Sequence, residues 1–473
     1  MEQSFCMLID GELVDNTVDH LAVTNPATCE CVARVPNAGA SELDRAVAAA
    51  NRSFPAWRDT DYDERRRAVL AAADTIEGHE AELSRLFTLE NGRPIAGAQA
   101  EIAGAVEWMR GMASFDLPVE VTEDNETRRV EVHHVPLGAV GAITAWNFPV
   151  MLAVMKFAPA ILTGNTVVLK PSPFTPLCTL RIGELVADHF PAGVLNVICG
   201  GDDLGPLMTA HPGLAKITFT GSSATGKRIM ESAAADLKRV TLELGGNDAA
   251  IVLPDVDVDT VALPIFFGAF ANTGQVCVAT KRLYVHDSIY EELRDRLHDL
   301  AKTMRVGNGL EDDVVLGPIQ NERQYRRVQA LLADARESGL TLLEGADVPE
   351  EGYFIKLAIV DNPPEDARVV SEEAFGPVLP MMRYSDLDDV VARANNSEYG
   401  LAGAIWSGDP DAAVALAKRL ETGRVWINEM LVMSHLTPQA GHKQSGVGAE
   451  SGIAGLMEFT QPKAIWISRT SNP

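Results

Sequence analysis

The feature that most restricts the fold of this chain is an alternation of short apolar segments with helical segments between residues 137 and 244. Strands that are apolar throughout are buried on both sides, so helices must cover both faces of their sheet. The pattern therefore predicts an α/β fold with a doubly wound parallel sheet, whose ligands bind beyond the carboxyl ends of its strands. The expected strands are 140–145, 166–170, 194–199, 217–220 and 240–244, and the expected helices are 151–162, 176–189, 204–210 and 225–235.

The segments on either side of this unit also have readable patterns. Residues 7–35 resemble short strands, and Ser41 suits the N-cap of a helix over 43–54. Helical periodicity continues over 64–90 and 95–114. A second α/β unit follows residue 245. Its expected helices are 261–270, 289–304, 321–337 and 409–420, and its expected strands are 282–285, 378–382, 404–406 and 425–428.

Two segments suggest an arm that leaves the body of the protein. Valines alternate with charged residues over 119–135, which predicts a β-hairpin with one solvent-exposed face. An apolar strand is expected at 464–468. Both would present unpaired edges. Because an isolated two-stranded ribbon is only marginally stable, we expect these elements to lie on a second copy of the chain.

The overall composition excludes several classes of function. A net charge of −26 argues against binding to nucleic acid or to an anionic membrane, and no long apolar run suggests a membrane span. The beginning of the chain lacks the pattern of a signal peptide, and six cysteines in 473 residues make no disulfide framework. No cluster suggests a metal site. We therefore expect a cytoplasmic protein.

Cys277 is the first candidate for chemistry. It follows Gly274 in an apolar run of small residues, where a thiol at the end of a tight loop would lie close to backbone N–H groups. A thiol reacts as the thiolate, so it needs a local base or a favourable field. The alternative is a buried structural cysteine, which is the more common situation for a free cysteine.

A phosphate-binding loop is the second candidate. The predicted strand 217–220 runs into Gly221 and a helix, which nearly matches a P-loop, but Arg228 stands where the Mg²⁺-binding hydroxyl should be. A strand, a glycine and a helix N-terminus still form an anion site, unless Ser222 or Ser223 simply caps the helix. Lys170 ends another strand of the same sheet. Together these features suit a dinucleotide.

Seven motifs then occur in the order found in one family, and the chain resembles the NAD(P)-dependent aldehyde dehydrogenase superfamily over nearly its whole length. The resemblance implies the fold of that family. The motifs are Thr144-Ala145-Trp146-Asn147-Phe148-Pro149, Lys170-Pro171-Ser172, Phe219-Thr220-Gly221-Ser222, Glu243-Leu244-Gly245-Gly246-Asn247, Gly274-Gln275-Val276-Cys277, Glu372-Glu373-Ala374-Phe375-Gly376-Pro377-Val378 and Lys443-Gln444-Ser445-Gly446.

The resemblance implies a covalent mechanism. Cys277 would attack the aldehyde carbon to form a thiohemiacetal, and the Asn147 amide with the Cys277 backbone N–H would bind the oxyanion. Loss of hydride to the nicotinamide would leave a thioester. Glu243 would activate the water that hydrolyses it, a task that a raised pKa favours. Lys156 matches a family lysine near the active site and would help to move protons.

The resemblance also implies a cofactor site for NAD, with NADP possible. Glu373 and Phe375 would contact the nicotinamide ribose, and Lys170 would reach the adenosine ribose. Much of the family has a glutamate where this chain has Pro173, so a 2′-phosphate would be less strongly repelled. The full predicted set is Thr144, Trp146, Lys170, Ser172, Gly221, Ser222, Gly226, Leu244, Gly245, Glu373 and Phe375.

A substrate tunnel follows from the same matching. Gln439 stands where the family usually has an aromatic residue, and no arginine is expected on the wall, so a hydrophobic or aromatic aldehyde is favoured over a semialdehyde acid. The predicted lining residues are Phe148, Met151, Leu152, Met155, Val276, Val278, Leu431, Met433 and Gln439.

The resemblance divides the chain into residues 1–118 and 137–244 for the cofactor, 245–445 for catalysis, and 119–136 with 460–473 for a homodimer or homotetramer. Two other readings stay open. A CoA-acylating semialdehyde dehydrogenase would have the same fold but typically lacks the glutamate at Glu243. A non-catalytic relative would have no need for Cys277, Asn147 and Glu243 together.

Overall fold

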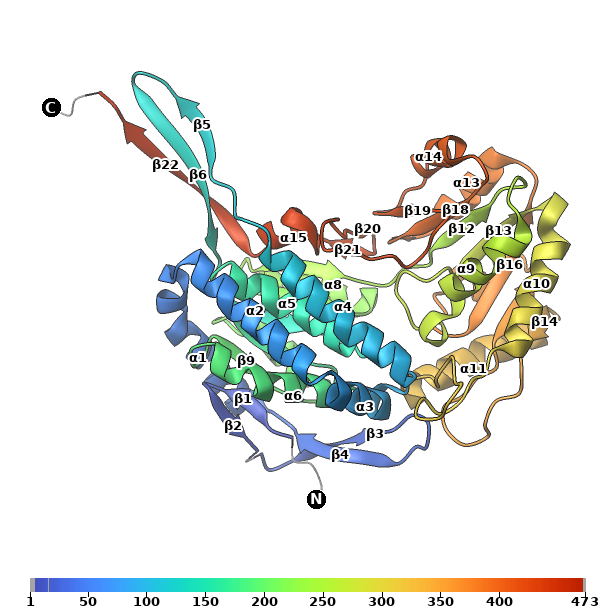
Figure 1. The fold of residues 1–473 in the computed structure, drawn as a ribbon, viewed down its shortest axis with the longest axis horizontal. Helices are drawn as coiled ribbons and strands as arrows, with labels where there is room; N and C mark the ends of the chain where they lie inside the picture. The colour runs from blue at the N-terminus through green and yellow to red at the C-terminus, as the bar shows by residue number, and fades with distance from the viewer. Residues whose placement is uncertain (1–4, 16, 471–473) are drawn as a thin grey trace.

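The computed structural model describes residues 5–15 and 17–470. Residues 1–4, 16 and 471–473, which belong to the predicted segments 1–118 and 460–473, lie outside the described part. Two α/β bodies lie side by side, each built on its own sheet, and a long β-arm projects from one of them (Figure 1). The predicted α/β class with doubly wound sheets is therefore confirmed.

The first body contains an eight-stranded sheet. Its five central strands run parallel, and the chain order reverses beside β7, with β8 and β9 on one side and β10 and β11 on the other. A reversal of this kind opens a crevice at the carboxyl ends of the strands. The sheet order is β2 (Glu12–Val14), β1 (Met7–Ile9), β9 (Leu195–Val197), β8 (Thr166–Lys170), β7 (Ala139–Ile143), β10 (Lys216–Thr220), β11 (Arg239–Glu243) and β21 (Gly446–Val447).

Helices cover this sheet, and two of the local predictions for them were wrong. Gly39 and not Ser41 precedes the first helix, because the Glu42 carboxylate accepts the Gly39 N–H at 2.9 Å. The helix expected over 64–90 is broken at His79, whose backbone leaves the helical region after Gly78. The helices are α1 (Ala40–Asp59), α2 (Tyr62–Gly78), α3 (Glu80–Asn91), α4 (Ile95–Ala113), α5 (Pro149–Leu162), α6 (Leu177–Val186), α7 (Leu204–Ala210) and α8 (Ser223–Ala234).

The second body contains a seven-stranded sheet that is parallel except for its first edge strand. The sequence did not indicate β12, β14, β15 or α13; each of these strands has only four residues, and α13 has nine. The strand order is β14 (Thr341–Glu344), β15 (Ala358–Asp361), β16 (Val378–Tyr384), β13 (Arg282–His286), β12 (Ala249–Val252), β18 (Gly403–Trp406) and β19 (Val425–Ile427). The helices are α9 (Val258–Phe270), α10 (Tyr290–Thr303), α11 (Glu322–Glu337), α12 (Arg368–Ser371), α13 (Leu387–Asn395) and α14 (Pro410–Ala417).

Short pieces complete the described chain. A hairpin of β3 (His20–Thr24) and β4 (Cys31–Pro36) lies near the N-terminus, and α15 (Gly452–Met457) precedes the last strand. Strand β17 (Tyr399–Gly400) pairs with β20 (His442–Lys443). Over residues 5–15 and 17–470, no helix is both long enough and apolar enough to cross a membrane.

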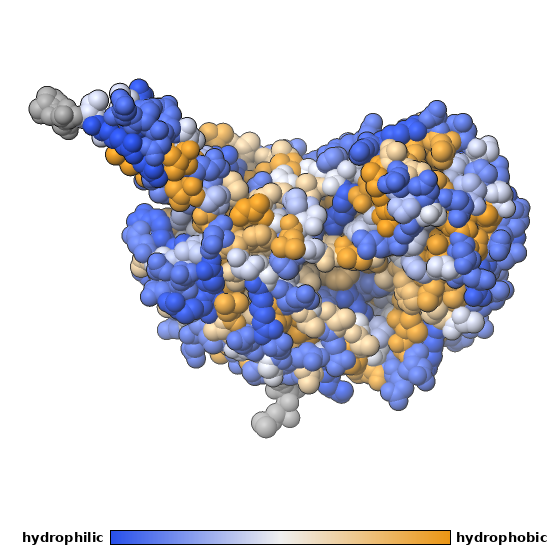
Figure 2. Space-filling view, turned by 45° about the horizontal axis from the view of Figure 1, so that its top comes forward, coloured by the Kyte–Doolittle hydropathy of each residue, from blue (hydrophilic) through white to orange (hydrophobic). Residues whose placement is uncertain are grey.

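The arm corrects one expectation. Its hairpin, β5 (Glu120–Asp124) and β6 (Arg128–Pro136), and the terminal strand β22 (Thr460–Ser468) are not separate unpaired elements. Strand β22 pairs antiparallel with β6 from Thr460 opposite Pro136 to Ser468 opposite Arg128. Two exposed edges satisfy each other's backbone groups in this way, which leaves only the outer edges of β5 and β22 free. The arm stands clear of the body, and the side in view is largely hydrophilic (Figure 2).

Candidate active site

The loop that carries Cys277 makes a sharp turn after α9. Asn272, Thr273 and Gly274 follow one another with φ of 51°, 56° and 75°, a left-handed run that non-glycine residues rarely adopt. A Cβ on Gly274 would lie 2.1 Å from the backbone oxygen of Gly376, so only glycine fits there. The turn leaves the Cys277 side chain half-buried, which allows access by a substrate.

Cys277 lies beside the predicted general base. Glu243 is the last residue of β11, and its carboxyl group lies close enough to the Cys277 thiol for each group to shift the pKa of the other. Burial, and after it the charge of Glu450, raises the pKa of Glu243 to about 7. Burial and the neighbouring Glu243 also raise the pKa of Cys277 well above its usual value. The alternative of an isolated structural cysteine therefore does not describe this site.

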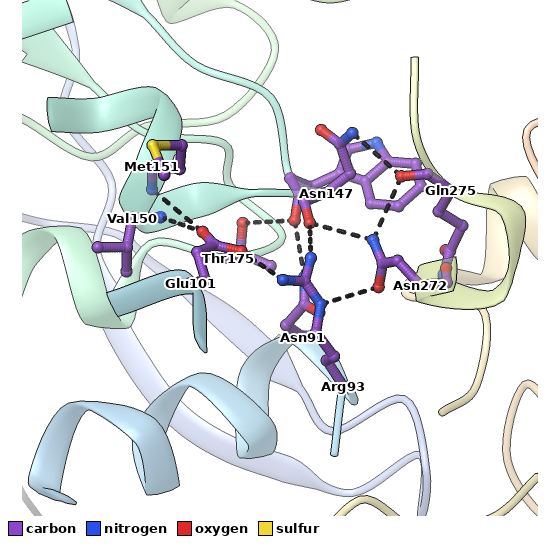
Figure 3. Close-up of polar contacts among 10 residues, drawn as sticks. Asn91, Arg93, Glu101, Asn147, Val150, Met151, Thr175, Asn272 and Gln275 are labelled. Carbon is purple, nitrogen blue, oxygen red and sulfur yellow. Dashed lines mark hydrogen bonds and ion pairs between the residues drawn. The ribbon is translucent and has the colours of Figure 1, made fainter. Parts of the chain in front are cut away.

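The predicted oxyanion donor, Asn147, is buried just before α5 and points its side-chain amide at this loop. Its Nδ2 donates to the Gln275 backbone oxygen at 3.1 Å, within the nucleophile loop (Figure 3). The Asn147 backbone oxygen accepts from Arg93 Nη2 at 2.6 Å and from Asn272 Nδ2 at 3.2 Å. The peptide of Asn147 is thus tied to the turn that presents Cys277.

Arg93 and Glu101 support this arrangement, and the sequence analysis missed both. Arg93 Nη1 forms a buried ion pair with Glu101 Oε2 at 2.5 Å, and its Nε donates to Asn272 Oδ1 at 3.1 Å. Glu101 Oε1 accepts the N–H groups of Val150 and Met151, in the first turn of α5 (Figure 3). One ion pair therefore joins α4, α5 and the nucleophile loop.

Lys156, on α5, is completely buried, and its ammonium lies 2.6 Å from Glu450 Oε1 and 3.3 Å from Thr218 Oγ1. The same lysine lowers the pKa of Glu243, whereas Glu450 raises it. The sequence did not indicate Glu450, because 294 residues separate it from Lys156. The Lys156–Glu450 ion pair therefore couples the charge of the Glu243 carboxyl group to the C-terminal loop.

Most of the predicted cofactor residues lie at the carboxyl ends of neighbouring strands. Thr144 and Trp146 follow β7, and Gly221 and Ser222 follow β10, on the two sides of the chain reversal. The hydroxyl oxygens of Thr144 and Thr220 are buried and have no hydrogen-bond partner. Unsatisfied polar groups at a crevice, next to a helix N-terminus, suit a polar ligand such as a dinucleotide.

Lys170 and Ser172 lie at the end of β8 and beyond it, and both are buried. Burial lowers the pKa of Lys170. Its Nζ bonds to the Pro171 oxygen at 3.3 Å, and no salt bridge to it is found within residues 5–15 and 17–470. Lys170 is therefore not a solvated surface residue, and a cation is available at this edge for an oxygen-rich ligand.

The remaining predicted cofactor residues meet at the end of β11. Glu373 Oε1 accepts the Gly246 N–H at 3.2 Å, and a Cβ on Gly245 would lie 2.4 Å from Glu373 Oε2. The Phe375 ring packs edge-to-face on Trp146, with centroids 5.3 Å apart. Leu244 is buried and packs so closely on α8 that a Cβ on Gly226 would lie 2.6 Å from it.

The predicted tunnel residues divide between the two bodies. Met151 and Met155 of α5, and with them Leu152, belong to the first body. Val276 and Val278 are buried in the core of the second, with Phe148, Cys277 and Leu431 packed against it. The Phe148 ring also lies under the Arg93 guanidinium, 4.3 Å from its centroid. Met433 is 46% exposed, which fits the outer end of a tunnel better than its base.

An arginine lies beside Gln439, one of the predicted tunnel residues, and the sequence did not indicate it. Arg424 Nη2 donates to Gln439 Oε1 at 3.1 Å, and Arg424 lies near enough to Cys277 and Glu243 to lower the pKa of both groups. Its Nε is buried and has no acceptor. Gln439 also pairs through its backbone with Glu450. The sequence could not reveal this, since Arg424 belongs to none of the motifs used.

The site brings together a thiol, a carboxyl group of raised pKa and the side-chain amide of Asn147. A model of the aldehyde dehydrogenase family matches residues 13–465, and the chain belongs to that family. It is accordingly an enzyme that oxidises aldehydes.

Individual relatives and solved structures agree with this. The chain is 40% identical over 467 residues to the aldehyde dehydrogenase LUC3 of a Fusarium species, covering 98% of this chain and 99% of the relative. It is 40% identical over 480 residues to phenylacetaldehyde dehydrogenase of Pseudomonas fluorescens, covering 98% and 95%. The NAD⁺ complex of an aldehyde dehydrogenase from Bacillus cereus superimposes with a TM-score of 0.96 at 35% identity, covering 98% and 97%.

Proposed function

We propose that the protein oxidises a hydrophobic or aromatic aldehyde to the carboxylic acid through a covalent adduct on Cys277. The observation that carries the proposal is the proximity of the Cys277 thiol to the Glu243 carboxyl group, with the Asn147 amide held beside the same loop. Thiol, base and oxyanion donor are the three groups that thioester chemistry requires.

Each residue has one task in this scheme. The Cys277 thiolate attacks the aldehyde carbon, and the Asn147 Nδ2 and the Cys277 N–H donate to the resulting oxyanion. Bound nicotinamide supplies a hydride acceptor. Glu243 then removes a proton from the water that attacks the thioester, and a pKa of about 7 leaves this carboxyl group about half ionised at neutral pH. The Lys156–Glu450 ion pair would help to move protons away from the Glu243 carboxyl group.

NAD is the proposed cofactor, with NADP accepted more weakly. Thr144, Gly221, Ser222 and the N-terminus of α8 would hold the pyrophosphate region, and Lys170 would bind the adenosine ribose. Leu244, Gly245, Glu373 and Phe375 would hold the nicotinamide side. The orphaned hydroxyl groups of Thr144 and Thr220 support this assignment. Thermal-shift titrations with NAD and NADP should give the larger stabilisation with NAD at equal concentration.

The substrate proposal rests on the apolar side chains around Cys277. The substrate would contact the apolar side chains of Phe148, Met155, Val276 and Val278. The Arg424 guanidinium already donates a hydrogen bond to Gln439. We expect higher kcat/KM for benzaldehyde or a medium-chain alkanal than for succinic semialdehyde. Kinetics with the opposite order would refute the substrate class and leave aldehyde oxidation intact.

The same assay separates the remaining readings. Reduction of NAD without CoA supports hydrolysis by Glu243, a strict requirement for CoA would identify an acylating enzyme, and no reduction with any aldehyde would identify a non-catalytic relative. The presence of Glu243 next to Cys277 favours the first.

The organisation of the chain is part of the proposal. We assign residues 1–118 and 137–244 to cofactor binding, 245–445 to catalysis, and 119–136 with 460–473 to assembly into a homodimer or homotetramer. The free outer edges of the arm support assembly, because a long exposed strand edge is a template for pairing. A cytoplasmic location suits a nucleophile that must stay a reduced thiol. Sedimentation of the purified chain tests the assembly.

A further inference from the structure

A buried lysine that the proposed mechanism does not use lies directly under the nucleophile. Lys281 stands four residues after Cys277, at the start of β13, and its side chain is 6% exposed. Its ammonium donates to the backbone oxygen of Cys277 itself, and lies 3.5 Å from the Ala279 oxygen. A charged group at this depth is costly unless it is paired and hydrogen-bonded, so its contacts define what it does.

The second set of contacts leads to the cofactor side. Lys281 Nζ lies 3.5 Å from Glu373 Oε1, the same oxygen that accepts the Gly246 N–H at 3.2 Å. The Lys281 N–H donates to the backbone oxygen of Asp248 at 2.9 Å. One ammonium therefore connects the nucleophile loop, the glycine turn after β11 and the loop that carries Glu373.

We propose that Lys281 is a positioning residue that fixes the Cys277 peptide, holds the Glu373 carboxylate in place, and supplies the positive charge that favours the Cys277 thiolate. The part that concerns Glu373 rests on its proposed role at the cofactor. The part that concerns the thiol rests on the contact between the Lys281 ammonium and the Cys277 backbone oxygen and does not depend on that role.

The charges around the thiol show why such a cation is needed. Among the groups that act on the Cys277 thiol, the Glu243 carboxyl disfavours the thiolate, and the cations Lys281 and Arg424 favour it. Burial and Glu243 raise the pKa of Cys277, and Lys281 opposes this rise more strongly than Arg424 does. Loss of Lys281 would therefore remove the stronger of these two opposing charges.

Acidic side chains lie close to the Lys281 ammonium. Two carboxyl groups face it, Glu373 in the contact above and Asp248, whose pKa burial raises to about 7 while Lys281 lowers it. Within the described part of the chain, Asp248 Oδ2 has no hydrogen-bond partner. Loss of the ammonium would remove the cation that lies next to both carboxyl groups, and their repulsion would push the Glu373 side chain away from the turn at Gly246.

The decisive experiment measures the alkylation rate of Cys277 by iodoacetamide across pH in the full-length protein, read as modification of the peptide that contains Cys277. Lys281→Met keeps the length of the side chain and removes the charge. We expect the pH profile of alkylation to move up by about one unit, so that the rate at pH 7 falls roughly tenfold. The KM for NAD should rise at least severalfold, because Glu373 loses its cation.

Two further variants separate positioning from damage to the fold. Lys281→Arg retains the positive charge and should return the alkylation profile to that of the wild type. Lys238→Met removes another buried lysine, paired with Asp236 at the opposite end of β11, and should change neither profile nor KM. Melting curves confirm that each variant is folded.

The outcomes are distinguishable. An alkylation profile in folded Lys281→Met that coincides with the wild type would overturn the inference about the thiol, and an unchanged KM for NAD would overturn the inference about Glu373. Neither result depends on whether the enzyme prefers the proposed aldehydes. Failure of the wild type to oxidise any aldehyde would refute the proposed function while the alkylation assay still reports on Lys281.

Discussion

Glu243→Gln should stabilise the protein above neutral pH while removing most of its steady turnover. The carboxyl group has a pKa of about 7 in the folded chain against 4.5 for the free group, a rise of roughly two and a half units. At 1.36 kcal/mol per unit this corresponds to about 3 kcal/mol of folding free energy that the ionised carboxylate costs. Glutamine has nearly the same shape and cannot ionise.

The sign of the effect fixes the pH window. Below pH 4.5 the carboxyl group is protonated in both the folded and the unfolded chain, so the variant should gain nothing. As pH rises from 4.5 to 7 the unfolded chain loses its proton first, and wild-type stability falls relative to the variant. Above pH 7 the whole difference is present. With about 1 kcal/mol per degree for a chain of this length, the melting temperature should rise by about 3 °C.

Two assays test this prediction. Melting curves at pH 5 and pH 8 should show the gain mainly at pH 8, and Glu231→Gln, on the exposed face of α8, should show none. Rapid mixing with NAD and an aldehyde should retain a burst of reduced cofactor, while the steady rate falls roughly a hundredfold or more, because only deacylation loses its base. Normal steady turnover, or an equal gain at both pH values, would refute the reasoning.

Three other substitutions follow from the site. Cys277→Ala should abolish dehydrogenase turnover yet keep the thermal shift with NAD, and turnover that persists would exclude this nucleophile. Arg93→Met should lose about 3–5 kcal/mol, because it leaves Glu101 charged and buried, and should lower kcat by freeing the Asn147 peptide; calorimetry and kinetics measure both effects, and wild-type values would contradict them. Gly274→Ala should lower both melting temperature and activity, since its Cβ would meet the Gly376 oxygen, whereas Gly205→Ala, which meets no atom within 4 Å, serves as the control.

Local pattern in the sequence determined the elements of the first sheet. The strand at Thr166–Lys170 and the helix at Leu204–Ala210 agree with the expected bounds. The pattern of apolar residues along such elements follows from which of their faces are buried, so it can be recognised in the sequence. The motifs also placed Cys277 on a loop and Glu243 at a strand end. These features depend on neighbours close in the chain.

The contacts between distant segments were decided only by the tertiary structure. Lys156 meets Glu450, 294 residues away; Arg93 reaches Asn147; and β22 pairs with β6. The periodicity of a segment does not specify which distant residue it will contact, because such contacts form only when the helices and sheets pack together. The chemistry of the thiol could be named from the sequence, whereas the field that sets its reactivity, from Glu243, Lys281 and Arg424, exists only in the folded chain.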